Sequence, residues 1–312
     1  MKLYITESEV IANLPMAKAI ELVEGAFREL AAGAAINHPR RRVVLPTGSI
    51  LHYMAAGTRE FFGIKVYSTN PKSGAHFEVL LYRSEDGMPL ATFEANHLGQ
   101  IRTGAASGVA TKFMAREDAS VAGIVGSGFQ AETQLEAIAS VRTLKEVRVW
   151  SRKPEKREAF AARAAERLGL NVRAVATPEE CVDKAGIVVT VTNTIEPVLR
   201  SEWIAPGTHI NAAGSNWPHR RELDSALILN RGALVAVDSV EVGRIESGDL
   251  LIPMKETGAS DLPACELADI VAGKRPGRAS ADQITIFKSN GLAVEDIAVA
   301  GYLYRQAAAR RG

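Results

Sequence analysis

The hydrophobic pattern of the first third of the chain is typical of a sheet followed by a helix. Short β-rich runs alternate with Gly, Pro, Asn and Asp turns, which predicts an antiparallel or mixed sheet. A strand at residues 2–5 and an amphipathic helix over Ala17–Ala32 precede this region, and an Ala- and Gly-rich helix over Gly99–Ala115 follows it. The strands expected in the sheet are Arg42–Leu45, Ile50–Ala55, Phe62–Tyr67, Phe77–Tyr82 and Pro89–Glu94.

From Ser120 onward, strands alternate with helices, and this pattern indicates βαβ units on a parallel sheet. A domain boundary is therefore expected near Arg116–Ala119. Residues 240–280 are polar and loop-like with helix-forming patches, and Val294–Arg310 is expected to form a final helix. The expected strands are Val121–Val125, Glu146–Trp150, Val172–Ala174, Ile187–Thr190, His209–Ala213 and Leu234–Val237. The expected helices between them are 129–140, Lys153–Leu168 and Glu179–Ala185.

The composition limits the classes of protein to which the chain can belong. Its 312 residues suggest two domains. With 37 basic and 36 acidic residues the net charge is +1, which argues against a nucleic-acid partner held by a basic face. Cys181 and Cys265 lie far apart without metal-ligand spacing, so we expect free thiols in a cytoplasmic protein without a metal site. The chain has no apolar run of roughly 18 residues and no signal-peptide core at its start, so no membrane association is expected.

A glycine-rich loop follows the first apolar strand of the second region. The run Gly126-Ser127-Gly128-Phe129-Gln130-Ala131 fits the GxGxxG/A pattern, comes directly after a strand and opens a helix. Gly126 permits a tight turn, Gly128 lets the backbone approach a pyrophosphate, and Ala131 is small enough for helix–strand packing. The helix N-terminus offers N–H groups and a positive dipole end to the anion. An ordinary glycine turn is the alternative, but the strand–helix context favours a dinucleotide site.

The end of the second strand indicates which dinucleotide is bound. An acidic residue there would hydrogen-bond the ribose 2′-hydroxyl, whereas this chain has Ser151, Arg152 and Lys153. These side chains suit a 2′-phosphate, with which Arg can pair bidentately. NADPH is therefore favoured and NADH remains possible, because Arg152 could instead stack over the adenine or lie in solvent.

Three cations in the first region suggest a site for a carboxylate. Arg41 should point opposite to its neighbours Arg40 and Arg42, because side chains alternate along a strand. Lys65 lies inside an apolar strand, where it is either an edge residue facing water or a buried amine with a lowered pKa suited to proton transfer. Arg102 is expected at the start of a helix, where the dipole would also favour an anion. Each cation alone fits a solvated surface charge, but the three together predict a carboxylate pocket.

Several segments together resemble the ornithine cyclodeaminase/mu-crystallin family over nearly the whole chain. Besides the glycine loop they include Gly63–Val66, Ile101–Ala106, Val149–Arg152, Thr190–Thr194, Gly207–Gly214, Arg221–Asp224, Ser247–Leu250 and Asn290–Asp296. The resemblance implies an α/β fold in which a Rossmann-type, doubly wound parallel-sheet domain (117–288) is inserted into an α+β substrate-binding and dimerisation domain. That domain would comprise 1–116 and a C-terminal helix within 289–312, and the protein would be a homodimer.

The resemblance also implies roles for individual residues. Arg41, Lys65 and Arg102 would hold the carboxylate of a small substrate, and Lys65 could supply or orient a proton. Residues outside the glycine loop that would lie near the cofactor are Thr103, Thr192, Asn193, Ser289 and Leu292. Members of the family include ornithine and lysine cyclodeaminases, alanine dehydrogenase-like enzymes, ketimine reductases and the hormone-binding mu-crystallin.

The chain departs from the cyclodeaminases at two positions. Asn216 stands where those enzymes carry a proton-handling aspartate, and asparagine cannot act as a base near neutral pH. His52 stands where they carry a glutamate that helps to hold a diamino substrate. Since His52 titrates near neutrality unless perturbed, it could be a proton donor or a packed pocket histidine.

The leading hypothesis is an NAD(P)H-dependent oxidoreductase that reduces a small α-imino acid, such as the cyclic ketimine pyrroline-2-carboxylate, or an α-keto acid. Lys65, His52 or a water held by Asn216 would manage the proton, while Arg41 and Arg102 would position the reacting carbon. A cyclodeaminating lyase with tightly bound NAD is one alternative, against which Asn216, His52 and the basic residues at 152–153 argue. A non-enzymatic binding protein of the mu-crystallin type is the other.

Overall fold

The computed structural model describes residues 2–230 and 232–311, which divide into two compact units. Residues 2–105 and 291–311 form the first, here called the terminal unit, and residues 106–290 form the second, here called the inserted unit. The division falls inside helix α3 (Asn96–Met114), whereas the sequence pattern placed a boundary at 116–119. The chain crosses between the units in mid-helix because the first half of α3 packs in one core and the second half in the other.

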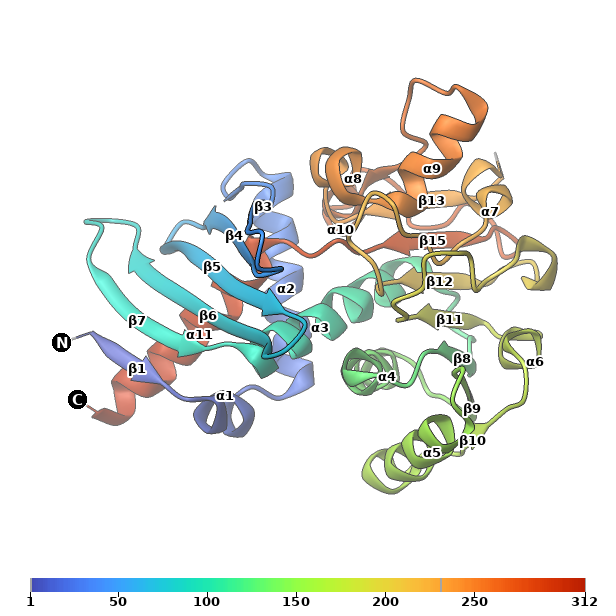
Figure 1. The fold of residues 1–312 in the computed structure, drawn as a ribbon, viewed down its shortest axis with the longest axis horizontal. Helices are drawn as coiled ribbons and strands as arrows, with labels where there is room; N and C mark the ends of the chain where they lie inside the picture. The colour runs from blue at the N-terminus through green and yellow to red at the C-terminus, as the bar shows by residue number, and fades with distance from the viewer. Residues whose placement is uncertain (1, 231, 312) are drawn as a thin grey trace. The chain divides into compact units, whose positions relative to one another are not determined.

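The terminal unit is a sheet with helices on one face (Figure 1). Its strands are β1 (Leu3–Ile5), β2 (Ile36–Asn37), β3 (Arg41–Val44), β4 (Ile50–Gly57), β5 (Phe61–Asn70), β6 (Gly74–Arg83) and β7 (Pro89–Glu94). The order is β1-β7-β6-β5-β4-β2, with β3 paired to β4, and every pair except β1–β7 is antiparallel. Helices α1 (Glu7–Asn13), α2 (Met16–Ala31) and α11 (Ala293–Arg311) complete the unit.

Side-chain alternation gives this sheet two different faces. On β5, Phe61, Gly63 and Lys65 are buried on the inner face, against which α11 packs, whereas Phe62 is exposed on the outer face. Helix α2 packs on α11 through its apolar face, which includes Val23 and Phe27. The apolar residues that recur with the helical period of 3.6 are therefore buried together in one core.

The inserted unit is a parallel sheet with the order β10-β9-β8-β11-β12-β15-β13-β14. Its strands are β8 (Val121–Val125), β9 (Glu146–Trp150), β10 (Val172–Ala174), β11 (Ile187–Thr190), β12 (His209–Ala212), β13 (Leu234–Val237), β14 (Cys265–Glu266) and β15 (Thr285–Lys288). The order runs outward in both directions from the β8/β11 pair, which is the switch point of a Rossmann-type sheet. The predicted fold class is therefore confirmed.

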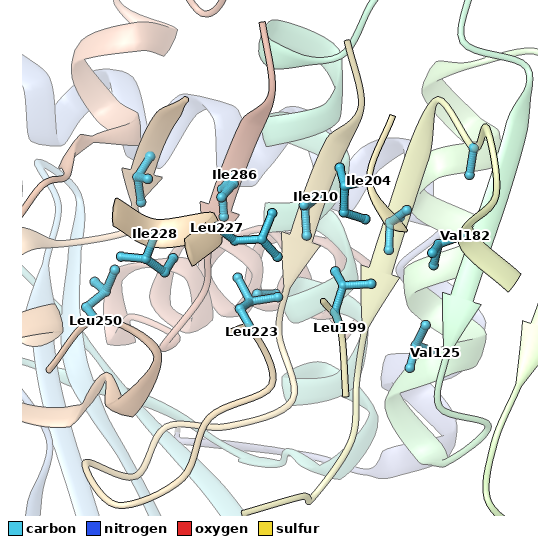
Figure 2. Close-up of a cluster of buried hydrophobic side chains, with 14 of the residues drawn as sticks. Val125, Val182, Leu199, Ile204, Ile210, Leu223, Leu227, Ile228, Leu250 and Ile286 are labelled. Atoms are coloured by element: carbon cyan, nitrogen blue, oxygen red, sulfur yellow. The ribbon is translucent and has the colours of Figure 1, made fainter. Parts of the chain in front are cut away.

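Helices cover both faces of this sheet. They are α4 (Phe129–Val141), α5 (Pro154–Leu168), α6 (Pro178–Val182), α7 (Ser225–Leu229), α8 (Val240–Glu246), α9 (Gly248–Thr257) and α10 (Leu267–Val271), with a 3-10 turn at Ser201–Trp203. One core contains Ile210, Ile286, Leu199, Leu223 and Leu250, and Figure 2 shows Ile210 and Ile286 on strands of the sheet with the three leucines gathered beside them. The loop segments around residues 199 and 223 and the start of helix α9 are thereby anchored to the sheet by apolar burial.

The structure differs from the sequence expectations at several elements. Helix α1, whose N-terminus is fixed by a Thr6/Glu9 capping box, and strand β15 were not predicted. Helix α3 begins at Asn96 rather than Gly99, so Arg102 lies in its second turn and does not benefit from a helix N-terminus. Residues 240–280, expected to be mainly loop, contain α8, α9, β14 and α10. None of the helices within 2–230 and 232–311 is long and apolar enough to cross a membrane.

Candidate active site

A cavity of about 730 Å³ opens at the switch point of the inserted unit. Its walls come from the segments that follow the carboxyl ends of β8, β9, β11 and β12, where ligands of such sheets bind. The lining residues predicted from the sequence are Gly126, Ser127, Gly128, Phe129, Gln130, Ser151, Arg152, Lys153, Thr192 and Asn193. Further lining residues include Trp150, Lys156, Val191, Thr194, Val198, Ala213 and Gly214.

The two glycines of the loop are needed for different reasons. Gly126 has φ = 121°, and a Cβ there would lie 2.6 Å from the carbonyl oxygen of Val191, so the fold itself excludes a side chain. Gly128 has an ordinary φ of −85°, and a Cβ there would meet nothing within 4 Å. Neither the backbone conformation nor neighbouring protein atoms require glycine at position 128. The missing side chain instead leaves room for a bound ligand to come close to the backbone.

Helix α4 starts at this loop and presents an uncapped N-terminus to the cavity. Gly128, which has no side chain, is the N-cap, so no N-cap side chain stands between the helix end and the cavity. Ala131 is fully buried and packs in the same cluster as Ile124 and Val149, so the helix lies close to the sheet. The positive end of the helix dipole and the backbone of this first turn make the point suitable for a pyrophosphate.

Basic side chains gather where β9 ends. The Ser127 hydroxyl donates to the Ser151 Oγ over 2.8 Å, which ties the glycine loop to the end of β9. Arg152 reaches Asn193 Oδ1 at 3.4 Å, and both Arg152 and Lys153 are exposed. Lys156, which the sequence reasoning missed, also lines the cavity. The sequence feature that could have identified Lys156 is its position three residues after Lys153, in the first turn of α5, because residues three apart on a helix lie on the same side.

The remaining residues that the sequence assigned to the cofactor do not line this cavity. Ser289 is buried directly after β15, and its N–H donates to the Ala212 carbonyl at 3.0 Å. Thr103 and Leu292 belong to the terminal unit, where the Thr103 hydroxyl donates to the Gly99 carbonyl at 2.7 Å and Leu292 is fully buried. Asn216, the proposed water holder, is half-buried in the loop after β12.

The terminal unit contains a cluster of charged side chains that is withdrawn from water. Lys65 Nζ donates to Asp296 Oδ1 at 2.8 Å, and Arg102 Nε donates to the same oxygen at 3.1 Å. Arg102 also donates through Nη1 to Glu295 at 2.7 Å. Lys65 is 3% exposed, Arg102 6%, and both acids 0%. Strand β5, helix α3 and helix α11 thus bring together residues that lie more than 190 positions apart.

Burial and neighbouring charges set the protonation of this cluster. Burial and the positive charge of Arg102 lower the pKa of Lys65 to about 8, although Asp296 opposes them. Burial alone would lower the pKa of Arg102, but Asp296 and Glu295 outweigh it, so the guanidinium stays charged. Lys65 is therefore protonated at pH 7 and can still lose its proton near neutrality, as a general acid must.

Arg40, and not Arg41, accompanies Lys65. Arg41 pairs with Tyr53 in the sheet and is exposed on the outer face. Arg40 is 5% exposed, donates to Met54 Sδ at 3.6 Å and contributes to the lowered pKa of Lys65. The predicted alternation is present, but it turns Arg41 away from the cluster and directs Arg40 toward it.

His52 lies on the inner face in a row of rings. It stacks on Tyr67 with centroids 4.3 Å apart, Tyr67 stacks on Phe77 at 4.8 Å, and Lys65 Nζ lies 5.7 Å from the Phe77 centroid. Burial and the charges of Arg42 and Arg40 lower the pKa of His52 to about 4. The environment of His52 therefore perturbs it, and the lowered pKa favours a neutral, packed histidine over a proton donor at pH 7.

Asp296 and Glu295 were not identified as site residues from the sequence. Their signal was an acidic pair set between Val294 and Ile297, since adjacent acids inside an apolar helical stretch must find buried partners. Among residues 2–230 and 232–311, no group of three or more His, Cys, Asp and Glu side chains could hold a metal ion.

Residues 2–311 match the ornithine cyclodeaminase/mu-crystallin family. This chain belongs to that family. A Δ1-pyrroline-2-carboxylate reductase of Bacillus cereus is 38% identical over 98% of this chain and 96% of its own length. Family membership, predicted from the motifs, is thus confirmed over nearly the whole sequence.

Two solved structures share the fold. That of Thermococcus litoralis Δ1-pyrroline-2-carboxylate reductase, in complex with NADH and L-proline, has 38% identity and a TM-score of 0.93, covering 99% of this chain and 98% of that one. An archaeal alanine dehydrogenase dimer with bound NAD has 32% identity and a TM-score of 0.92, covering 100% and 97%. Both are oxidoreductases with a nicotinamide cofactor, the class expected from the glycine loop.

Proposed function

We propose that this protein is an NAD(P)H-dependent reductase of small cyclic α-imino acids of the pyrroline-2-carboxylate type. The observation that carries the proposal is the composition of the buried cluster. Lys65 and Arg102 form buried ion pairs with Asp296 and Glu295, and Arg40 adds a third buried positive charge that is close enough to lower the pKa of Lys65. Three buried cations from three different segments would attract and hold the carboxylate of a small substrate.

The residues of the cluster divide the work by their chemistry. Arg102 is charged at all working pH values, and its planar guanidinium suits a carboxylate. In the reaction the C=N π bond breaks, a C–H bond forms at the α-carbon, and the nitrogen takes a proton from the Lys65 ammonium. Solvent then reprotonates the neutral Lys65 amine. The ring row of His52, Tyr67 and Phe77 offers a flat apolar wall beside Lys65, as a ring-shaped substrate requires.

The cavity of the inserted unit fits a dinucleotide in size and donor chemistry. The uncapped N-terminus of α4 would hold the pyrophosphate, and the open space at Gly128 would allow its approach. When bound, NAD(P)H supplies the hydride for the α-carbon. The relatives with bound NADH and NAD carry the same fold over nearly their whole chains, which supports this assignment.

The finer choice of cofactor rests on three cations. Arg152, Lys153 and Lys156 line the cavity near the end of β9, the position that meets the adenosine ribose in such sheets. Since no acid stands at this position to accept the 2′-hydroxyl, we assign NADPH as the preferred cofactor, with NADH also accepted.

The test is oxidation of NADPH in the presence of candidate acceptors. Purified protein is mixed with NADPH and pyrroline-2-carboxylate, piperideine-2-carboxylate, or pyruvate with ammonia, and the absorbance of the reduced nicotinamide is followed. Oxidation with a cyclic imine supports the proposal, and oxidation only with pyruvate and ammonia would assign an alanine dehydrogenase-type activity. No oxidation with any acceptor would overturn it, and ammonia release from ornithine without reductant would assign the lyase.

We also propose that the outer face of the terminal sheet joins two copies of the chain. Leu51, Tyr53 and Phe62 are 43%, 38% and 39% exposed on this face, so three large apolar side chains meet water on one side of the sheet. A second copy of the same surface would cover it by two-fold symmetry.

Phe62→Glu should convert a dimer into a monomer in sedimentation velocity, whereas Ile195→Glu, at an exposed apolar residue of the inserted unit, should not. A monomeric wild type would overturn the proposal.

A further inference from the structure

Two loops that line the cavity of the inserted unit are tied to a single buried carboxylate. Glu222 Oε1 accepts from the Thr192 N–H at 2.6 Å and from the Thr192 hydroxyl at 2.7 Å. Its Oε2 accepts from the Gly214 N–H at 2.8 Å and from the Thr190 hydroxyl at 2.9 Å. Thr192 follows β11 and Gly214 follows β12, so one side chain fixes the ends of two adjacent strands.

The segment that carries Glu222 is itself fixed. Asp249 Oδ1 accepts from the N–H groups of Glu222 and Leu223 at 2.7 and 2.9 Å. Lys288 Nζ lies 3.4 Å from the other oxygen of Asp249 and donates to the carbonyls of Ala212 and Ser215. Glu222, Asp249 and Lys288 are all 0% exposed, and Leu223 and Leu250 beside them pack in the core of Figure 2. The carboxylate is therefore held rigidly from both sides.

The loops approach each other too closely to adjust independently. A Cβ at position 214 would lie 2.4 Å from the backbone nitrogen and oxygen of Thr192 and 2.5 Å from Glu222 Oε1. Thr192 and Gly214 both line the cavity, so a shift of the carboxylate would change the shape of its wall.

We propose that Glu222 is a positioning residue for the nicotinamide half of the bound dinucleotide. The proposal rests on the assignment of the cavity as the dinucleotide site. The glycine loop and the Arg152 cluster follow β8 and β9, on the side of the switch point that serves the pyrophosphate and the adenosine. Thr192 and Gly214 follow β11 and β12 on the other side, so they serve the remaining half of the cofactor.

The hydrogen-bond pattern requires a carboxylate and not an amide. Glutamine can accept from Thr192 through its oxygen, but its NH₂ group would then face the N–H of Gly214, and two donors repel. Glu222→Gln should therefore release the loop after β12. Thr190→Val is a milder variant, because it removes one bond to Oε2 at a buried residue that does not line the cavity.

The test compares the affinity of a whole cofactor with that of half of it. NADH and ADP-ribose are titrated by calorimetry into the wild type, Glu222→Gln and Thr190→Val. The matched control is Glu146→Gln, where a glutamate of the same unit accepts from Arg148 and Arg173 at the start of β9, at the opposite end of the sheet from both loops. We expect NADH affinity to fall about tenfold in Glu222→Gln and about threefold in Thr190→Val, with ADP-ribose affinity unchanged, as the loss of one hydrogen bond implies.

The two affinities decide whether Glu222 positions the nicotinamide half, and they do so without a measurement of turnover. A selective loss of NADH affinity supports the proposal, even if the protein reduces no imine. Equal losses for NADH and ADP-ribose would reduce Glu222 to a general structural role and overturn it, as would unchanged NADH affinity in both variants. A wild type that binds neither ligand would overturn the cofactor assignment and this inference together, whereas binding without imine reduction would overturn only the proposed reaction.

Discussion

The two candidate sites of this protein are built from different materials. In the inserted unit the cavity is shaped by backbone: a glycine turn, an uncapped helix N-terminus and loops at strand ends. In the terminal unit the site is a set of buried charged side chains that come from β5, α3 and α11. A backbone site depends on the shape of a few consecutive residues, whereas a side-chain site depends on the balance of charges far apart in sequence.

This difference predicts opposite sensitivities. The backbone site should lose ligand when atoms are added to it, and its protonation should matter little. The charge cluster should lose activity when a charge is removed, and its activity should follow pH. The following substitutions separate the two kinds of site.

The largest effect is expected at the side-chain site. Lys65→Met removes the proposed proton donor while keeping an unbranched side chain of similar length. Turnover with pyrroline-2-carboxylate should fall by about 10²–10⁴-fold, the usual contribution of a general acid. NADH affinity, measured by calorimetry, should stay within about twofold of the wild type, since the loop 126–131 is untouched. A variant that keeps wild-type turnover would show that Lys65 donates no proton.

The next largest effect separates the two glycines of the backbone site. Gly128→Val adds a Cβ that meets no protein atom within 4 Å, so the melting temperature should hold while NADH affinity falls by about 10–100-fold, because the pyrophosphate can no longer approach. Gly126→Ala is the contrast: its Cβ would lie 2.6 Å from the Val191 carbonyl at φ = 121°, and stability should fall by about 1–3 kcal/mol. Calorimetric binding and thermal melts decide both. An unchanged NADH affinity in Gly128→Val would contradict the inference that Gly128 leaves room for the pyrophosphate.

A smaller effect is expected in the pH dependence of turnover. Lys65 must be protonated to donate, and its pKa is about 8, so the rate should be constant below that pH and fall as pH rises through it. Asp296 raises the pKa of Lys65, so Asp296→Asn should move this fall to lower pH and reduce turnover at pH 7.5 by about tenfold. Rates over a pH series, with unchanged NADH affinity as the control, test this. A fall at the same pH in both proteins would mean that another group controls the profile.

The smallest effect concerns the choice of cofactor. Arg152 is exposed, and ion pairs in water contribute about 1 kcal/mol or less, so Arg152→Ala should weaken NADPH binding by about fivefold and leave NADH binding unchanged. Lys112→Ala, at a basic residue of α3 outside the cavity, should change neither affinity. Equal losses for both cofactors would place Arg152 against the adenine and not at the 2′-phosphate.

Much of the backbone site could be predicted because its information is local. Strand β8, the glycine loop and α4 are consecutive in sequence, and so are β9 and the Ser151–Lys153 run. Period, turn chemistry and spacing therefore identified most of the lining residues. Thr192 and Asn193 came from the family resemblance, since nothing local marks the end of β11 as part of a ligand site.

The charge cluster was predicted only in part. An apolar strand around Lys65 signalled a buried amine, but no local pattern names its partner. Arg40 and Arg41 are adjacent, and the choice between them depends on which of the two side chains lies on the inner face of the sheet. His52 gives the same lesson, because its pKa of about 4 arises from burial and from two arginines on another segment.

By itself, the sequence determined the fold class, the glycine loop and the family, because these depend on periodicity and on residues that are neighbours along the chain. The tertiary structure alone decided that Asp296 and Glu295 hold Lys65 and Arg102, that Arg41 faces away from them, and that Glu222 fixes the loops after β11 and β12. Those contacts join residues that only packing brings together, and electrostatic interactions depend on distance and burial, which no single segment encodes.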